Sequence, residues 1–357
     1  MIIQSAKPCL DEADRAAILR VFDAGLIAEG GDIERFEVEL AAFLRMPGAV
    51  AVSSGFAALH LALKALEVGC GDEVIIPCVS TCPALRNAVW AAGATPVYAD
   101  INRNDFNLSI DSVGTAMTPR TRAIIAPHHT GIPADIPGLI ALKIPVIEDC
   151  AQAIGASWRG RPVGSFGTAS VFSFYATKLM TSVDGGAVCS LTPSITERVR
   201  EFRYYRHRRD GRMRFNYKMQ NLHAALGRSQ LKKLLQFIER RHAIAHQFLG
   251  VFTAAGGDLR QSMHQVDGAV YFKLALRLAP ADRDRLLDEA QQRGLPCSTE
   301  FDWVAEEPGR YPNAEHLMAR IITLPVYPAL TDGEVRSLST MFKESLLAVG
   351  AVDSGEA

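Results

Sequence analysis

The stretch VFSFYATKLMTSVDGGAV, residues 171–188, sets one lysine among apolar and aromatic residues. Lysine is normally a surface residue, so Lys178 is unusual in this setting. Desolvation favours the neutral amine of a lysine, and a neutral amine can attack a carbonyl carbon to form a Schiff base. The alternative is a lysine at a strand end whose amine reaches the solvent.

A second candidate, Asp149, ends an apolar run in VIEDCAQAIGA, residues 146–156. Sheets of α/β proteins bind ligands in the crevice beyond their strand ends. A buried carboxylate there needs a cationic partner, such as the protonated ring nitrogen of pyridoxal phosphate. Asp149 could instead cap a helix that starts at Cys150. Gln152 follows one helical turn later, on the same side as Asp149.

The segment AVSSGFAALHLAL, residues 51–63, has the pattern of a strand, a Ser-Ser-Gly turn and a helix. Free N–H groups at such a helix start can bind phosphate. Many strand–turn–helix units share this pattern, so it is a weak signal by itself.

These three segments and two others, in chain order, resemble the DegT/StrS family of sugar aminotransferases. The motifs that carry the resemblance are SSGFAALHLAL at 53–63, GDEVIIP at 71–77, IEDCAQAIGA at 147–156, FSFYATK at 172–178 and FNYKMQNLHAALGRSQL at 215–231. The resemblance covers residues 25–241, and a weaker similarity is found in TLPVYPALTDGEV at 323–335. The resemblance implies a fold-type-I enzyme that uses pyridoxal phosphate.

The resemblance assigns catalytic roles to two residues. Lys178 would hold the cofactor as a Schiff base and then move the proton between the substrate and cofactor carbons. Asp149 would pair with the pyridinium nitrogen and keep it protonated. Gln152 would contact the O3′ side or the face of the ring.

The resemblance also implies a phosphate site and a composite dimer. Ser173 and the N–H groups of Gly55 and Phe56 would bind the cofactor phosphate. Asn216 would reach the phosphate of the neighbouring subunit, which makes the active unit a homodimer.

The chain departs from the family pattern mainly around the substrate. Phe56 stands where the family usually has Thr, and Asp184 stands where it commonly has Glu. The segment CVSTCPALRNAV lacks the aromatic that often stacks on the cofactor ring, with Thr81 or Cys82 near that place. The region 298–318 is short and lacks a Pro-His-rich segment. These differences concern the substrate more than the cofactor.

The composition argues against other classes of protein. The 357 residues include 38 Lys and Arg against 39 Asp and Glu, with 48% hydrophobic and 22% charged residues. This balance is typical of a globular protein and unlike that of a disordered chain. It also lacks the basic excess of a general nucleic-acid binder.

We expect a cytoplasmic protein with no membrane span and no metal site. No apolar run reaches the roughly 18 residues that a membrane helix needs, and the start of the chain turns acidic, unlike a signal peptide. The seven cysteines are mostly scattered, which argues against a disulfide framework. Cys78 and Cys82 lack a second ligand pair at zinc-site spacing.

Short β-rich runs alternate with helical patterns, which predicts an α/β fold with a mainly parallel mixed sheet covered by helices. The expected strands are 49–52, 74–76, 96–99, 123–126, 146–147, 170–174 and 187–190, the last two close enough for a hairpin. Helices are expected at 10–23, 33–45, 57–67 and 85–92. These elements form a large pyridoxal-phosphate-binding domain, residues 1–240.

The rest of the chain, residues 241–357, predicts a smaller α+β domain. One helical pattern covers 221–249 and leads into it. A strand at 269–277, a helix at 280–293 that Gly294 stops, and a helix at 332–348 follow. The tail AVDSGEA, 351–357, is expected to be disordered.

Two polar clusters add hypotheses about ligands. Eight arginines lie between 198 and 214, either as contacts to a sugar-nucleotide diphosphate or as a solvated basic surface. His128 and His129 follow a strand end. Neighbouring side chains of an extended chain point opposite ways, so we expect one histidine to face the cofactor pocket rather than a metal shared by both.

The sequence therefore predicts an aminotransferase that moves an amino group, from glutamate, onto a nucleotide-linked keto-sugar or a keto-cyclitol in amino-sugar, secondary-metabolite or surface-glycan biosynthesis. Lys178 argues against the dehydratase branch of the family, in which His replaces that lysine. The alternative is a degenerate, non-catalytic relative that acts as a regulator or scaffold. Two features support this alternative: Phe56, and the absence of the aromatic residue that often stacks on the cofactor ring.

Overall fold

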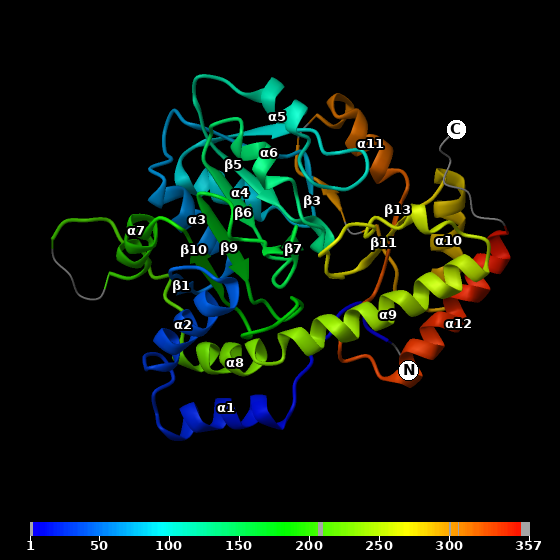
Figure 1. Cartoon of the computed structure of the whole chain (residues 1–357), viewed down its shortest axis with the longest axis horizontal. Helices are drawn as coiled ribbons and strands as arrows, with labels where there is room; N and C mark the ends of the chain where they lie inside the picture. The colour runs from blue at the N-terminus through cyan, green and yellow to red at the C-terminus, as the bar shows by residue number, and fades with distance from the viewer. Residues whose placement is uncertain (1–2, 206–209, 300, 306, 351–357) are drawn as a thin grey trace.

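The structure, a computed structural model, describes residues 3–205, 210–299, 301–305 and 307–350. Its main element is a seven-stranded sheet in the order β1-β10-β9-β6-β5-β2-β4 (Figure 1). β10 is antiparallel to both neighbours, and the other adjacent pairs are parallel. The strands are β1 (Ala49–Val52), β2 (Glu73–Pro77), β4 (Thr95–Ala99), β5 (Thr121–Pro127), β6 (Val146–Asp149), β9 (Ala169–Ser173) and β10 (Gly186–Cys189). The predicted mixed sheet and the pairing of its last two strands are confirmed.

Helices cover both faces of the sheet because its strands are apolar on both sides. Val50 and Val52 of β1 pack with α3 (Gly55–Ala65), α4 (Ala84–Ala92) and α7 (Pro193–Arg203). Ala49 and Ala51 face the opposite way and pack with α2 (Asp32–Leu44) and α8 (Asn221–Leu231). Further along this second face lie α5 (Ile110–Ala116) and α6 (Ile136–Ile140). Outermost, α1 (Glu12–Asp23) packs on α8 (Figure 1).

The helical pattern predicted for 221–249 is divided in two, which corrects our expectation of an unbroken helical run. α8 ends at Leu231, and α9 (Leu234–Ala254) begins after Lys233. The junction is held by polar contacts to the start of α1: Gln230 Nε2 donates to Asp14 Oδ2 at 2.8 Å, and Lys233 Nζ lies 2.6 Å from the same oxygen. These contacts favour a break at this point over a straight helix.

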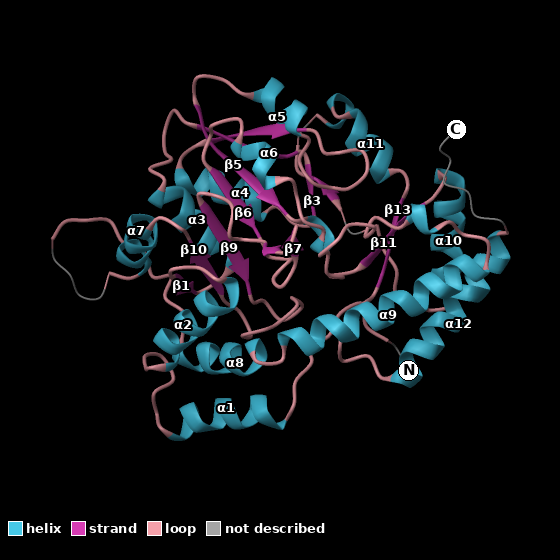
Figure 2. Ribbon diagram, viewed as in Figure 1, coloured by secondary structure: helices cyan, strands magenta, loops and turns pink. Residues whose placement is uncertain are grey.

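A second core lies at the far end of α9, where Figure 2 shows the C-terminal helices and strands gathered around it. It is built by the second half of α9, the antiparallel pair β11 (Leu274–Arg277) and β13 (Ile321–Leu324), α10 (Pro280–Gln292) and α12 (Asp332–Val349). Leu234 packs in the core around the sheet, whereas Ile244 packs in this second core. We propose the domain division at residue 240, within α9, with Ile3 also packing against the smaller core.

Short elements complete the chain. They are β3 (Val79–Ser80) paired with β12 (Asp302–Trp303), β7 (Ser157–Trp158) paired with β8 (Arg161–Pro162), α11 (Pro312–Met318), and the 3₁₀ helices η1 (His129–Gly131), η2 (Leu259–Gln261) and η3 (Pro308–Arg310). Within the described residues, no helix combines the length and the apolar character that crossing a membrane requires. The tail at 351–357, which we expected to be disordered, lies outside the described residues.

The strand predicted for 269–277 is too long, because its first half is not part of the sheet. Val270 N–H donates to Gly131 O at 3.0 Å, and Phe272 N–H donates to Thr130 O at 3.1 Å. These backbone groups bind the turn after β5, so strand pairing starts only at Leu274.

Candidate active site

A cavity of about 320 Å³ lies at the carboxyl ends of the parallel strands. This size is within the usual range for small-molecule sites, and the position is the one at which α/β sheets bind ligands. Six of the seven predicted site residues line it, namely Gly55, Phe56, Asp149, Gln152, Ser173 and Lys178. The fold thus brings together residues that are far apart in the sequence.

Lys178 lies in the connection between β9 and β10, where its backbone N–H donates to Tyr175 O at 3.0 Å. Its Nζ atom lies 5.2 Å from the ring centroid of Phe272. The side chain is neither fully buried nor exposed. The amine therefore faces the cavity beside an aromatic wall.

Asp149 is the last residue of β6, and its Oδ1 accepts a hydrogen bond from Ala151 N–H at 3.0 Å. Burial raises the pKa of this carboxyl, while the Ala151 N–H and the nearby Lys178 and His128 act in the opposite direction. A cation beside Asp149 would stabilise its ionised form. The carboxyl is thus suited to a positively charged partner in the cavity.

Gly55 and Ser173 approach each other closely at the start of α3. A Cβ atom on Gly55 would lie 2.8 Å from Ser173 Cβ and 3.0 Å from Ser173 Oγ. Ser54 caps α3, since its Oγ accepts from Ala57 N–H at 3.1 Å. Among the hydrogen bonds of the described residues, none uses the N–H of Gly55 or Phe56. These two donors and the Ser173 hydroxyl form a small set suited to an anion.

Gln152 links three segments of the cavity wall. Its Oε1 accepts from Thr130 N–H at 2.7 Å, and its Nε2 donates to Thr81 Oγ1 at 2.9 Å. Thr130 has a left-handed backbone with φ of +53°, which is unfavourable for a β-branched residue. The amide of Gln152 therefore helps to hold a strained turn.

Asn216 is the one predicted site residue that does not line the cavity. It is exposed and forms an isolated β-bridge with Tyr204. Within one subunit it is therefore separate from the other six.

The chain matches the DegT/DnrJ/EryC1/StrS aminotransferase family over residues 8–343. It belongs to this family. It is 31% identical to the GDP-perosamine synthase of Vibrio cholerae, over 94% of the chain and 97% of that protein. It is 29% identical to the dTDP-4-dehydro-2,3,6-trideoxy-D-glucose 4-aminotransferase of Saccharopolyspora spinosa, over 97% of both.

A solved structure of a similar protein has the same fold. DesV of S. venezuelae, solved in complex with a ketimine intermediate, superposes with a TM-score of 0.85 at 32% identity, over 96% of this chain and 98% of that one. The predicted fold class and family are thus confirmed. As a DegT/DnrJ/EryC1/StrS protein, the chain is an aminotransferase of a class that uses pyridoxal phosphate.

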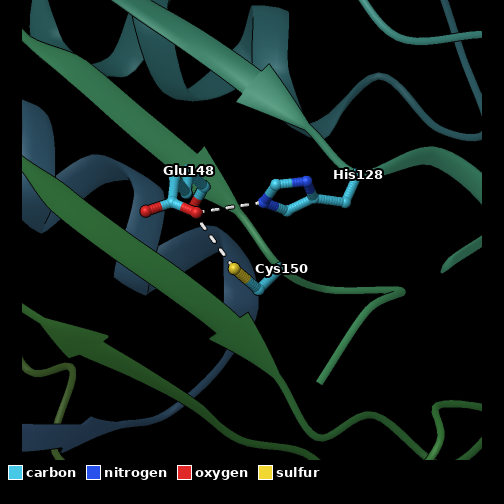
Figure 3. A group of neighbouring side chains, drawn as sticks. All are labelled: His128, Glu148 and Cys150. Atoms are coloured by element: carbon cyan, nitrogen blue, oxygen red, sulfur yellow. Dashed lines mark hydrogen bonds and ion pairs between the residues drawn. The ribbon is translucent and has the colours of Figure 1, made fainter. Parts of the chain in front are cut away.

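Beside the aminotransferase cavity, His128, Glu148 and Cys150 form a buried cluster whose ligand atoms lie within 4.8 Å of one another (Figure 3). His128 Nδ1 accepts from Ala134 N–H at 2.9 Å, so Nε2 carries the proton that it donates to Glu148 at 3.2 Å. Both Glu148 oxygens also accept backbone N–H groups from the turn 164–167. Burial and the Glu148 carboxylate raise the pKa of the Cys150 thiol. The three side chains thus form a hydrogen-bonded network in this structure.

Both adjacent histidines line the cavity, rather than the single one that we expected. Burial lowers the pKa of His129 to about 3, so its ring is neutral near pH 7. The ring lies edge-on to Phe301, with centroids 5.2 Å apart. His129 is packed between the cavity and the segment that precedes β12.

The arginine cluster is partly structural. Of its five members that the structure describes, four pair with carboxylates of the same chain: Arg198 with Glu67, Arg200 and Arg203 with Glu37, and Arg214 with Glu201 and Asp210. Arg198, Arg200 and Arg203 lie on α7, a helix that we did not anticipate. Arg206, Arg208 and Arg209 lie outside the described residues.

Sequence reasoning missed Phe272 and Thr130, which contact residues of the site. Phe272 reaches Lys178 from the C-terminal part of the chain, and Thr130 is bound by Gln152. Neither has a local motif, so no signal in the single sequence identifies them.

Proposed function

We propose that the chain is a cytoplasmic homodimer that transfers an amino group from glutamate to the ketone of a nucleotide-linked keto-sugar. The main observation in support of this proposal is that Lys178, Asp149 and the Gly55–Ser173 pair lie around one cavity. The relatives from Vibrio and Saccharopolyspora are named for GDP-linked and dTDP-linked sugars, which supports this class of substrate. A keto-cyclitol is the second substrate class within the same proposal.

The residues of the cavity fit pyridoxal phosphate. The N–H groups of Gly55 and Phe56 and the Ser173 hydroxyl suit its phosphate, and Gly55 leaves room that a Cβ would fill. Asp149 is a half-buried carboxyl that a ring cation would stabilise in its ionised form. Lys178 supplies the amine for the aldehyde, with the Gln152 side chain at the wall near the ring.

When bound, pyridoxal phosphate supplies an electron sink for the charge left on the substrate carbon. Lys178 Nζ would accept the proton from that carbon, as a base, and deliver it to the cofactor carbon, as an acid. Asp149 would hold the ring nitrogen of the cofactor and keep it protonated through its negative charge. The surrounding apolar walls, including Phe172 and Leu85, keep water from these groups.

The first experiment is an absorbance spectrum of the purified protein with pyridoxal phosphate. We expect a yellow protein whose colour borohydride removes, with the reduced adduct on Lys178 in a mass-spectrometric peptide map. Lys178→Ala should lower transamination by several powers of ten while the protein stays folded. Substantial activity in this variant would overturn the assignment.

A panel of substrates with glutamate then tests the acceptor. We expect amination of a nucleotide-linked keto-sugar and little reaction with the corresponding free sugar. Preference for a keto-cyclitol would select the second substrate class. A protein that binds the cofactor but aminates none of them would support the non-catalytic regulator or scaffold that Phe56 suggests.

A further inference from the structure

The segment 269–273, in the C-terminal part of the chain, brings the ring of Phe272 next to Lys178. Phe272 N–H donates to Thr130 O at 3.1 Å, and Phe272 O accepts from Arg241 Nη1 at 3.1 Å. Arg241 is buried and donates to Tyr271 O as well, also at 3.1 Å. The backbone of Phe272 is therefore fixed from both sides, on the turn after β5 and on α9.

The side chain of Phe272 is fixed as well. Its ring is buried and packs in the hydrophobic cluster that contains Phe174, Leu179 and Met180, the residues that flank Lys178 in space and in sequence. The Lys178 Nζ atom lies 5.2 Å from the Phe272 ring centroid, within the range of a cation–π contact. The amine thus has one defined aromatic neighbour.

We propose that Phe272 is a positioning residue for Lys178, through which the segment 269–273 takes part in the proton transfer. This inference rests on the proposed function, in which Lys178 is the reacting amine. The proton would leave the substrate carbon for Nζ, which becomes an ammonium group, and would then pass to the cofactor carbon. The face of the ring attracts that ammonium group and limits the rotamers of its side chain.

The test compares Phe272→Leu and Phe272→Met, which keep an apolar side chain, with Phe272→Tyr, which keeps the ring. We expect the Leu and Met variants to lower kcat about ten-fold, with the KM for glutamate changed less than about two-fold. Phe272→Tyr should retain most of the kcat. Phe342→Leu is the control, because Phe342 is a buried phenylalanine of the second core, away from Lys178.

A second readout does not depend on turnover. Apo protein is mixed with pyridoxal phosphate and borohydride, and the rate of adduct formation on Lys178 is followed by mass spectrometry. Phe272→Leu and Phe272→Met should form the adduct several-fold more slowly than Phe272→Tyr and Phe342→Leu. The melting temperatures of the variants are measured as well, so that a lower rate is not caused by a loss of folded protein.

Equal kcat values and equal trapping rates in the Leu, Met and Tyr variants would overturn the inference. Having two apolar variants keeps the test valid if one of them fails to fold. A failure of the proposed function is recognised separately. In that case Lys178→Ala would retain transamination activity, and this result does not depend on the Phe272 variants.

Discussion

At the scale of one residue, the position of Asp149 in the fold affects the pKa of its carboxyl. The end of β6 half-buries its carboxyl, and this desolvation raises its pKa, while the nearby Lys178 acts in the opposite direction. Asp149→Asn keeps the shape and removes the charge that favours a protonated ring nitrogen. We expect kcat to fall about 100-fold, with a small change in cofactor affinity by absorbance titration. Unchanged turnover would mean that Asp149 serves only to accept the Ala151 N–H.

Gly55 tests the proposed phosphate site at the same scale. In Gly55→Ala the new methyl group would lie 2.8 Å from Ser173 Cβ, so Ser173 or the start of α3 must move. We expect pyridoxal phosphate to bind about ten-fold more weakly. Gly48→Ala is the control, because a Cβ there meets nothing within 4 Å. Equal affinities of the two variants for pyridoxal phosphate would contradict a phosphate site beside Gly55.

At the scale of elements, the side chain of Glu37 joins α2, β1 and α7. Its Oε1 accepts from Ala51 N–H at 2.9 Å, and its two oxygens lie 2.6 Å and 2.5 Å from the Nη1 atoms of Arg200 and Arg203. These contacts explain why part of the arginine cluster belongs to the fold rather than to a substrate surface. A helix at 193–203 was needed to bring both arginines to one carboxylate.

Glu37→Ala should therefore destabilise the protein, since it leaves a buried N–H group and Arg203 without their partner. We expect the free energy of unfolding, measured by urea denaturation, to fall by about 3 kcal/mol. Glu34→Ala, an exposed position of the same helix, should have little effect. A similar decrease in the free energy of unfolding in both variants would mean that the contacts of Glu37 with the two arginines do not stabilise the fold.

At the scale of the whole molecule, the separation of Asn216 from the cavity bears on the proposed dimer. If Asn216 completes the site of the neighbouring subunit, each site needs residues from two chains. Mixing Lys178→Ala with Asn216→Ala subunits should then restore activity, since one of the two sites in a mixed dimer has a full set. Inactive mixtures with proven subunit exchange would contradict the composite site.

Two buried histidines should make the whole molecule sensitive to acid. Burial lowers the pKa of His129 to about 3 and that of His264 to about 4, below the 6.5 of an exposed histidine. Both are neutral in the folded protein, so their contribution to stability is present above pH 6.5 and is lost as the pH falls toward 4. We expect the melting temperature to decrease across this range.

His264→Phe isolates this effect, because the ring can still stack on Tyr271, whose centroid is 4.4 Å away. The variant should lose less melting temperature between pH 6.5 and 4 than the parent protein. His246→Phe, at an exposed position, is the control. Equal slopes in the two variants would show that His264 does not cause the acid sensitivity.

The sequence alone determined the alternating strands and helices, the family, and six residues that line one cavity. These features depend on local patterns, such as an apolar run that ends in Asp149 or a Ser-Ser-Gly turn before a helix. Because the carboxyl ends of parallel strands meet at one edge, residues placed at those ends come together without further information.

Only the tertiary structure decided which distant groups complete that cavity. The pairing of Phe272 with Thr130 shortens a predicted strand and brings an aromatic ring to Lys178. The contacts of Gln230 and Lys233 with α1 break a predicted helix, and Glu37 gathers arginines from another element. Each depends on hydrogen bonds or charge pairs between segments far apart in the chain. Local periodicity carries no information about such partners, because it records only which face of an element is apolar.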